Sequence, residues 1–172
     1  IRMNGQLYAG EIYSQHIDGN AHLTLQFTFE VEPHFDKTPG GLFAARCGSL
    51  VYAVPIKYKK AMREYEENKV ERKYPYCDYD YKGVSDWNVA FAGKNFRVTE
   101  HPVGEIPFSE SNPPLTVEAP LCHIGWGYAE GLETVPARVP MSRRQSDEAK
   151  LRTLIPYGCT MLRMTELPLA RP

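Results

Sequence analysis

Carboxylates are the most numerous side chains in this 172-residue chain that could perform chemistry, and their spacing decides what they could do. A glycosidase needs two carboxyl groups that flank the bond to be cleaved. The sequence alone cannot place any two at the required separation. The acids that could supply such a pair are Glu30, Glu32, Asp86, Glu100, Glu105, Glu110 and Glu118. Because several of them lie in a loop-like stretch, we interpret them as solvated charges and predict no catalytic residue.

Histidines and cysteines are the next candidates, as ligands for a metal ion. His16 and His22 flank an expected hairpin turn, and Cys122 is followed directly by His123. A zinc site requires three or four such ligands at recognisable spacing, and neither pair brings a third. The sequence therefore predicts no metal site and no cofactor.

Two small nucleophiles, Ser49 and Cys159, each follow a glycine. Nucleophilic catalysis needs a base and an orienting group beside the nucleophile. The Gly-x-Ser-x-Gly turn between a strand and a helix is missing here. We interpret both glycines as turn residues.

Aromatic side chains on a β surface can stack on sugar rings, and this chain has an obvious set of them. The same side chains are ordinary packing partners across strands, which is the more frequent role. The set is Tyr74, Tyr76, Tyr79, Tyr81, Trp87 and Trp126. If the chain binds carbohydrate, we expect the contacts from Trp87, Trp126, Tyr76 and Tyr79.

These residues must be positioned by short strands, because prolines and glycines interrupt the chain often. The clearest pattern is residues 21–31, which alternate in polarity and follow the turn Asp18-Gly19-Asn20, so they should pair with residues 10–14. Pro120 should interrupt another strand, and the Pro156-Tyr157-Gly158 turn should join a closing strand pair. The further expected strands are 42–45, 50–56, 89–91, 96–100, 115–119, 121–128 and the pair within 147–165.

One segment, residues 57–72, has a helical pattern. Tyr58, Ala61, Met62 and Tyr65 are spaced as on one face of a helix. We expect either a short solvated helix or an excursion between strands. The whole pattern predicts an all-β fold, an antiparallel β-sandwich resembling a jelly roll, formed by residues 1–172 as a single domain.

Composition excludes several classes of partner. The net charge of −1 argues against non-specific binding of nucleic acid or of an anionic membrane surface. No apolar run approaches the roughly 20 residues that span a bilayer. No signal peptide is visible, but the chain starts at Ile1 rather than Met, so we interpret it as part of a longer protein.

The four cysteines, Cys47, Cys77, Cys122 and Cys159, lie far apart in the sequence. Their number is too small for a disulfide scaffold in a chain of this size. We expect reduced thiols that pack as small hydrophobic groups, which favours the cytoplasm. Two disulfides in an exported protein are the alternative, so the compartment stays open.

Five segments, taken in order, carry a resemblance to a known family. The first is Met3-Asn4-Gly5-Gln6 with the hairpin through Val31, and the second is Gly48-Ser49-Leu50-Val51-Tyr52-Ala53. The remaining segments are Ser85-Asp86-Trp87-Asn88, Asn112-Pro113-Pro114-Leu115-Thr116-Val117, and Leu154-Ile155-Pro156-Tyr157-Gly158-Cys159 with Leu162 to Pro168. Their order resembles the C-terminal part of glycoside hydrolase family 127, the β-L-arabinofuranosidase-like family.

The resemblance implies a role for this chain. In that family an (α/α)₆ helical barrel carries catalysis through a glutamate and a zinc-bound cysteine, and β-sandwich domains follow the barrel. This chain resembles the region after the barrel, so none of those residues maps onto it. The implied role is a non-catalytic accessory domain that supports an upstream helical-barrel domain or mediates a homodimer.

Two other functions stay open at this point. A free-standing carbohydrate-binding module would present a row of exposed aromatic side chains. A structural or oligomerisation domain of a protein with different chemistry would show a large symmetric interface. A β-sandwich is compatible with all three functions.

Overall fold

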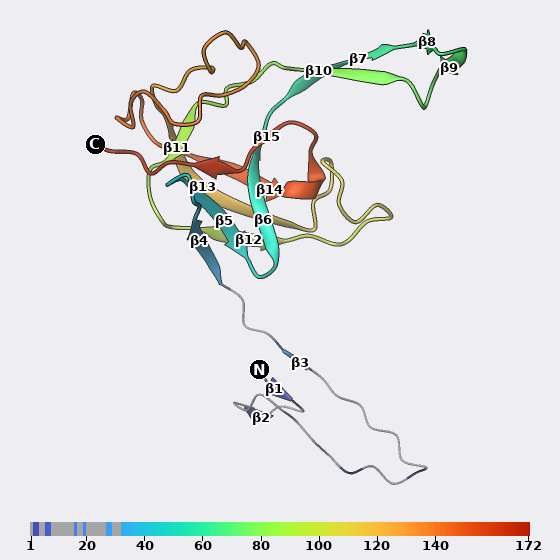
Figure 1. The fold of residues 1–172 in the computed structure, drawn as a ribbon. Helices are drawn as coiled ribbons and strands as arrows, with labels where there is room; N and C mark the ends of the chain where they lie inside the picture. Colours follow the sequence, from blue (N-terminus) through green and yellow to red (C-terminus); the bar gives the residue numbers. More distant parts are fainter. Residues whose placement is uncertain (1, 4–5, 8–15, 17–18, 20–26, 29–31) are drawn as a thin grey trace. The chain divides into compact units, whose positions relative to one another are not determined.

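The structure is a computed structural model that describes residues 2–3, 6–7, 16, 19, 27–28 and 32–172 (Figure 1). The chain divides into two compact units, Ile1–Glu32 and Pro33–Pro172. Among the described residues the only helical element is a single 3₁₀ turn, η1 (Tyr157–Cys159). All named strand pairs are antiparallel, so the predicted all-β fold class is confirmed.

The first unit contains a small sheet of three strands. In its order β2-β1-β3, the central strand β1 (Arg2–Met3) pairs with β2 (Gln6–Leu7) and with β3 (Phe27–Thr28). β3 lies within the strand expected over residues 21–31. The remainder of that expected strand and its expected partner at 10–14 lie outside the described residues, as does most of the turn between them.

The second unit is built on a nine-stranded antiparallel sheet. Its main path runs β11-β13-β14-β6-β5-β16, with β12 beside β13, β15 beside β6 and β4 beside β5. The strands are β4 (Pro33–Lys37), β5 (Phe43–Cys47), β6 (Leu50–Pro55), β11 (Val89–Phe91), β12 (Arg97–Glu100), β13 (Leu115–His123), β14 (Lys150–Pro156), β15 (Arg163–Met164) and β16 (Glu166–Leu167).

This sheet curls until its two ends meet. At one end, the Phe91 N–H of β11 donates to the Pro168 carbonyl at 2.9 Å, and the Ala170 N–H donates back to the Phe91 carbonyl at 2.8 Å. The segment after β16 therefore satisfies backbone groups that an open sheet edge would leave unpaired. The two facing halves of the curled sheet enclose the core, as in a β-sandwich.

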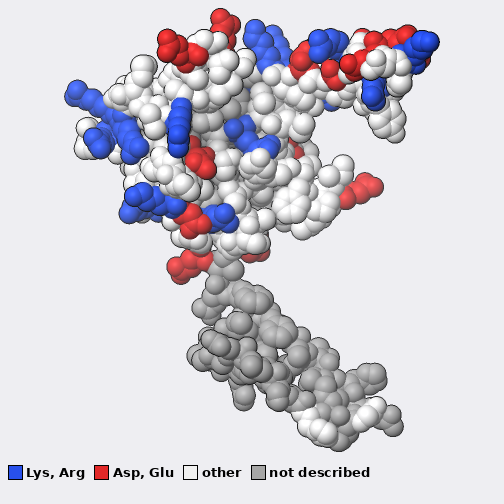
Figure 2. Space-filling model, in the orientation of Figure 1, with Lys and Arg blue, Asp and Glu red and all other residues white. Residues whose placement is uncertain are grey.

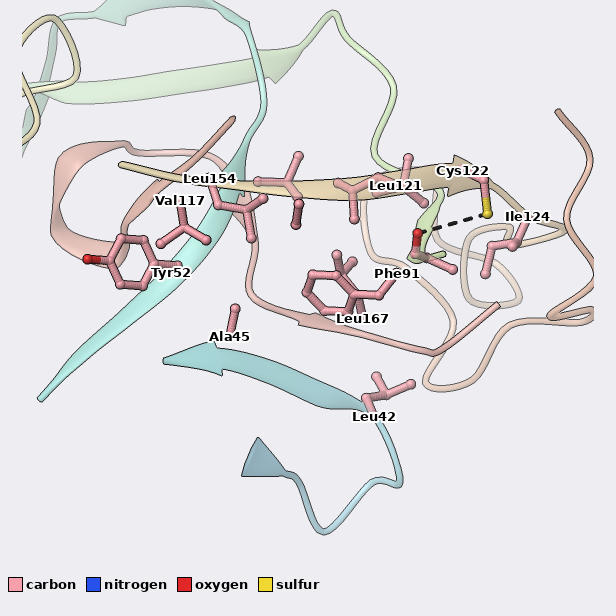
Figure 3. Packing of buried hydrophobic residues seen from close by; sticks show 14 of the residues in the cluster. Leu42, Ala45, Tyr52, Phe91, Val117, Leu121, Cys122, Ile124, Leu154 and Leu167 are labelled. Atoms are coloured by element: carbon pink, nitrogen blue, oxygen red, sulfur yellow. Dashed lines mark hydrogen bonds between the residues drawn. The ribbon is translucent and has the colours of Figure 1, made fainter. Parts of the chain in front are cut away.

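The core consists of the inward side chains of the central strands (Figure 3). Tyr52 of β6, Phe91 of β11 and Leu154 of β14 are all 1% exposed or less. The Phe91 ring lies 4.5 Å from that of Phe35 on β4 and 6.3 Å from that of Phe96, centroid to centroid. Burial of these large rings is the main source of stability in the unit.

β13 runs without interruption through Pro120, contrary to the expected break. The Pro120 carbonyl accepts from the Ala92 N–H at 2.9 Å, so this residue faces the side of β13 that pairs with β11 and β12. In an antiparallel strand the N–H of a residue would face the same side as its carbonyl. Ala92 and Pro120 follow the pair Phe91↔Leu121, and because proline has no N–H they keep one of the two hydrogen bonds that such a pair exchanges. This single lost bond lies where the pairing with β11 ends, before the pairing with β12 begins at Arg97↔Glu118, so β13 continues through it.

The closing strand pair expected within residues 147–165 is also wrong in its pairing. β14 and β15 do not form a hairpin with each other; both pair with β6, at Tyr52–Ala53 and at Val54–Pro55 respectively. The turn between them is η1. After η1 the chain therefore returns to pair with β6 instead of folding back to pair with β14.

Residues 57–83 form a long two-stranded ribbon that projects from the sheet (Figure 1). β7 (Tyr58–Arg63) pairs with β10 (Asp78–Gly83), and β8 (Tyr65–Glu67) pairs with β9 (Val70–Arg72). The helix considered for 57–72 is wrong, and the alternative of an excursion between strands is confirmed. The turn at Asn68 and Lys69 has positive φ at both residues, 54° and 65°, which matches the twist of a hairpin.

Candidate functional site

A cavity of about 420 Å³ lies at the base of the ribbon, and we call it the base pocket. Its size falls within the range of roughly 300–1,000 Å³ that holds small molecules in proteins. Two carboxylates, two cations and two hydroxyls line it together with aliphatic side chains. The lining residues are Val54, Pro55, Lys57, Ser85, Asp86, Glu110, Arg152, Thr153 and Ile155.

Both ends of the ribbon meet at this pocket, and hydrogen bonds fix them there. The Lys57 N–H donates to the Ser85 hydroxyl at 2.9 Å, and the Val84 N–H donates to the Lys57 carbonyl at 2.7 Å. Glu110 comes from the long connection before β13 and accepts from the Tyr58 hydroxyl at 3.4 Å. The sheet supplies the floor through Val54 on β6 and Ile155 on β14.

A histidine stands beside the pocket and joins two of its charged groups. The Nε2 atom of His123 lies 3.3 Å from Asp86 Oδ2 and 3.2 Å from the guanidinium of Arg152. The His123 N–H and the ring Nδ1 lie 2.7 and 2.6 Å from the two oxygens of Asp147. These hydrogen bonds from His123 hold the pKa of Asp147 below its ordinary value.

This arrangement gives His123 two alternative partners. A neutral ring that donates Nδ1–H to Asp147 leaves Nε2 to accept from Arg152. A protonated ring donates from Nε2 to Asp86 instead. The base pocket thus offers acceptors at Asp86 and Glu110 and donors at Lys57 and Arg152, a set that can hydrogen-bond to a polyhydroxylated ligand.

The rings of the two tryptophans lie together, and one of them, Trp87, follows Asp86 in the sequence. Their rings meet edge to face at 5.8 Å between centroids, and Trp87 lies 5.0 Å from Tyr128. Trp87 Nε1 donates to the Tyr128 hydroxyl at 3.0 Å, and Trp126 Nε1 donates to the Ala137 carbonyl at 2.8 Å. Trp126 is only 6% exposed, whereas Tyr128 is 50% exposed. The outward aromatic surface of this cluster is therefore formed by Trp87 and Tyr128.

Tyr76 and Tyr79, the other two predicted sugar contacts, belong to the ribbon. Tyr76 is 81% exposed, and Tyr74, two residues before it, is 72% exposed. Tyr79 packs under the Lys60 ammonium, which lies 4.0 Å from its ring centroid, and its hydroxyl donates to the Pro75 carbonyl at 3.3 Å. A hydrogen bond with Cys77 and partial burial raise the pKa of Tyr79 to about 12. The four residues are thus divided between the ribbon and the tryptophan cluster, and their role in sugar binding stays a prediction.

The candidate metal ligands and nucleophiles are placed as follows. In the part of the chain that the structure describes, no three His, Cys, Asp or Glu side chains are grouped to hold a metal ion. His22 lies outside that part. Cys122 is buried against the core, and burial raises the pKa of its thiol. Burial also raises the pKa of Cys159 in η1, while Ser49 lies at the edge of a separate apolar hollow.

All four cysteines are unpaired thiols, as expected. Cys77, Cys122 and Cys159 are buried and Cys47 is partly buried.

Glu30, one of the seven acids proposed from the sequence, lies outside the described residues; of the other six, the structure brings two, Asp86 and Glu110, to one cavity. Sequence reasoning missed the roles of Arg152 and Asp147 in this site. No local spacing indicates their approach, because β13, β14 and the preceding loop bring them to His123 only through sheet pairing.

No helix among the residues that the structure covers has the length and apolar character needed to cross a membrane. Comparison with protein-family models, curated proteins and solved structures finds no match to this chain.

Proposed function

We propose that this chain is a non-catalytic accessory β domain of a glycoside hydrolase resembling family 127, and that it packs against the catalytic domain of that enzyme. The observation that carries the proposal is the ribbon of residues 57–83. It extends beyond the sheet, and nearly all of its side chains are exposed. A two-stranded hairpin is at best marginally stable by itself, so a contact surface on another domain favours an arm of this kind.

The end of the ribbon has the composition of a contact surface. Tyr74 and Tyr76 are 72% and 81% exposed, and Met62 and Val70 are 51% and 49% exposed. Tyrosine is enriched among the residues that dominate binding energy at protein interfaces. The mixed charges of the ribbon, visible in Figure 2, suit a polar rim around such a contact.

An apolar hollow of about 590 Å³ on the sheet supports the same role. Leu50, Val51, Phe108 and Tyr157 line it, and Phe108 and Tyr157 are about half exposed. An accessory domain removed from its neighbour is expected to expose an apolar surface of this type. The identity of that neighbour comes from the five sequence segments whose order resembles the region after the helical barrel.

Site-specific photo-crosslinking in the full-length protein tests the proposal. A benzophenone side chain at position 76 should form crosslinks to the upstream domain of the same chain, mapped by mass spectrometry. The matched control is position 151 on β14, where Leu151 is 68% exposed but outside the ribbon. The absence of crosslinks from position 76 to the upstream domain would contradict the proposal. Clear hydrolysis of an aryl arabinofuranoside by this chain alone would also contradict it.

A second candidate function, carbohydrate binding, is favoured by the base pocket. Carboxylates and a guanidinium around an aliphatic floor can bind the hydroxyls and the apolar face of a sugar ring, and Trp87 adjoins Asp86 in the sequence. Tryptophan fluorescence titrated with arabinan and xylan oligosaccharides should then saturate. The response should be lost in Asp86→Ala and Glu110→Ala but kept in Asp80→Ala, an exposed acid on the ribbon. A flat response from the unmodified chain would rule this candidate out.

A further inference from the structure

A second polar hollow, of about 430 Å³, lies between residues 140–144 and the last two residues of the chain. Three arginines line it: Arg143, Arg144 and Arg171. Figure 2 shows Lys and Arg side chains gathered on the side of the molecule where Figure 1 marks the C-terminus. We call this hollow the arginine pocket. It is separate from the base pocket, and the proposed function assigns it no role.

Backbone hydrogen bonds hold the three arginines in place. Arg144 and Arg171 form a parallel β-bridge. The Arg171 N–H donates to the Arg143 carbonyl at 2.8 Å, and the Gln145 N–H donates to the Arg171 carbonyl at 3.0 Å. The side chains therefore extend from a fixed frame, which lowers the entropy lost when they bind a common ligand.

Backbone contacts also hold Ser142, which lines the pocket beside the arginines. The Ser142 N–H donates to the Gly125 carbonyl at 3.0 Å, and a Cβ atom at Gly125 would lie only 3.2 Å from Ser142 Cβ. The Ser142 hydroxyl accepts from the Arg144 N–H at 3.1 Å. Its own hydrogen is left to donate to a ligand.

The arginines of this pocket have no ion-pair partner in the described part of the chain. Among the described residues, no carboxylate lies within the 4.0 Å of an ion pair from Arg143, Arg144 or Arg171. Other arginines of this unit do have such partners, as Arg46 has Asp36 at 2.7 Å and Arg63 has Asp78 at 3.2 Å. Three like charges on neighbouring segments repel one another, and an anion between them removes that repulsion.

We propose that the arginine pocket binds a compact oxyanion, a phosphate or sulfate group. The planar guanidinium presents a fork of N–H donors that matches two oxygens of such a group at once. Three guanidinium groups and the Ser142 hydroxyl can surround a tetrahedral anion. Pro140, Met141 and Pro172 form an apolar wall beside it, which suits the organic part of a phosphate ester.

The test is an NMR titration of the chain with inorganic phosphate and with phenyl phosphate at constant ionic strength. Saturable shifts are expected at the amides of residues 142–145 and 171. Sodium acetate at the same ionic strength should produce much smaller shifts at those amides. Tighter binding of phenyl phosphate than of phosphate would identify an ester as the ligand, and equal binding would identify the free anion; both support the site.

Two variants locate the binding energy. Arg144→Gln and Arg171→Gln should each weaken phosphate binding by about tenfold, the order expected for one charged hydrogen-bonding pair. Arg63→Gln, which removes an exposed guanidinium on the ribbon, should leave phosphate binding unchanged. No saturable shift in the unmodified chain, or equal binding in all variants, overturns the proposal. Because the titration of the unmodified chain is read at named amides, it decides the matter even if a variant folds poorly.

Discussion

Asp147 holds His123 at two points, with one carboxylate oxygen 2.7 Å from the His123 backbone nitrogen and the other 2.6 Å from the ring Nδ1. This double contact fixes both the position of β13's last residue and the orientation of its ring. It also aims Nε2 at Asp86 and Arg152, at the border of the base pocket.

The first prediction concerns the dependence of stability on pH. The pKa of Asp147 is lowered in the folded state, so below its ordinary value of 3.8 the unfolded chain takes up a proton that the folded chain does not. The stabilisation is fully present above pH 3.8 and is lost as the pH falls through the lowered pKa. Urea unfolding midpoints measured from pH 6 to pH 2 should therefore fall less steeply in Asp147→Asn.

A matched control for this experiment is Asp80→Asn on the ribbon. Asp80 is exposed and forms no ion pair among the described residues. Its variant should reproduce the pH profile of the unmodified chain. If both variants give the same profile as the unmodified chain, Asp147 makes no contribution of this type.

The second prediction concerns the buried hydroxyl of Tyr52. This residue is 0% exposed, and its hydroxyl has no hydrogen-bond partner among the described residues. Burial raises the pKa of Tyr52 to about 12, and the nearby thiols of Cys47 and Cys159 contribute less to this shift. Because an unpaired buried polar group costs about 1–3 kcal/mol, Tyr52→Phe should leave the free energy of unfolding unchanged or increase it. A loss of more than about 1 kcal/mol in urea unfolding would reveal a partner for the hydroxyl.

The third prediction concerns the aromatic core. Phe91 is 1% exposed and packs on Phe35 at 4.5 Å. Phe91→Ala should lower the free energy of unfolding by about 3–5 kcal/mol, because it removes buried apolar surface and leaves a cavity. Leu151→Ala, at a site 68% exposed, should change it by less than about 0.5 kcal/mol. Comparable losses in the two variants would mean that Phe91 does not lie in the core.

The fourth prediction concerns the order in which the thiols react. Cys77 is buried at 9% exposure within the ribbon, whereas Cys122 and Cys159 are buried in the body of the sheet. Local opening of a solvent-exposed hairpin requires less free energy than opening the core. Under native conditions an alkylating reagent should therefore modify Cys77 well before Cys122 and Cys159, as measured by peptide mass mapping. Simultaneous modification of all three would indicate that only global unfolding exposes them.

The fifth prediction concerns the turn of the ribbon. Lys69 has φ of 65°, a left-handed conformation that costs a residue with a Cβ atom about 1–2 kcal/mol. Lys69→Gly removes this strain, but glycine also makes the unfolded chain more flexible, which offsets part of the gain. The free energy of unfolding should therefore increase by about 0.5–1 kcal/mol. Amide hydrogen exchange should slow in β8 and β9 and stay unchanged in β13. Faster exchange in β8 and β9 would contradict the turn geometry.

Local sequence patterns were sufficient to predict the fold class and most strand positions of the second unit. Leu50 to Pro55 is apolar on both faces, and it forms the central strand β6 between β5 and β14. Local composition suffices in such cases because a strand covered on both faces must be apolar throughout. The polar and turn residues that precede β11 and β12 located these two strands within a residue of their observed bounds.

The ribbon was ambiguous in the sequence for a physical reason. Its strands are exposed on both faces, so they lack the alternation that a half-buried strand requires. Its turn is Asn68-Lys69 instead of the Asn-Gly that is typical of a two-residue hairpin. The chance helical spacing of Tyr58, Met62 and Tyr65 was then the strongest local pattern.

Which charged residues come together depends on the pairing of distant strands. Asp86, His123 and Arg152 are far apart in the sequence and meet because β14 pairs with β13 and the ribbon returns beside them. The arginine pocket depends in the same way on the bridge between Arg144 and Arg171. Hydrophobic patterning is a property of neighbouring residues, whereas such a site arises from long-range pairing, which no local pattern records.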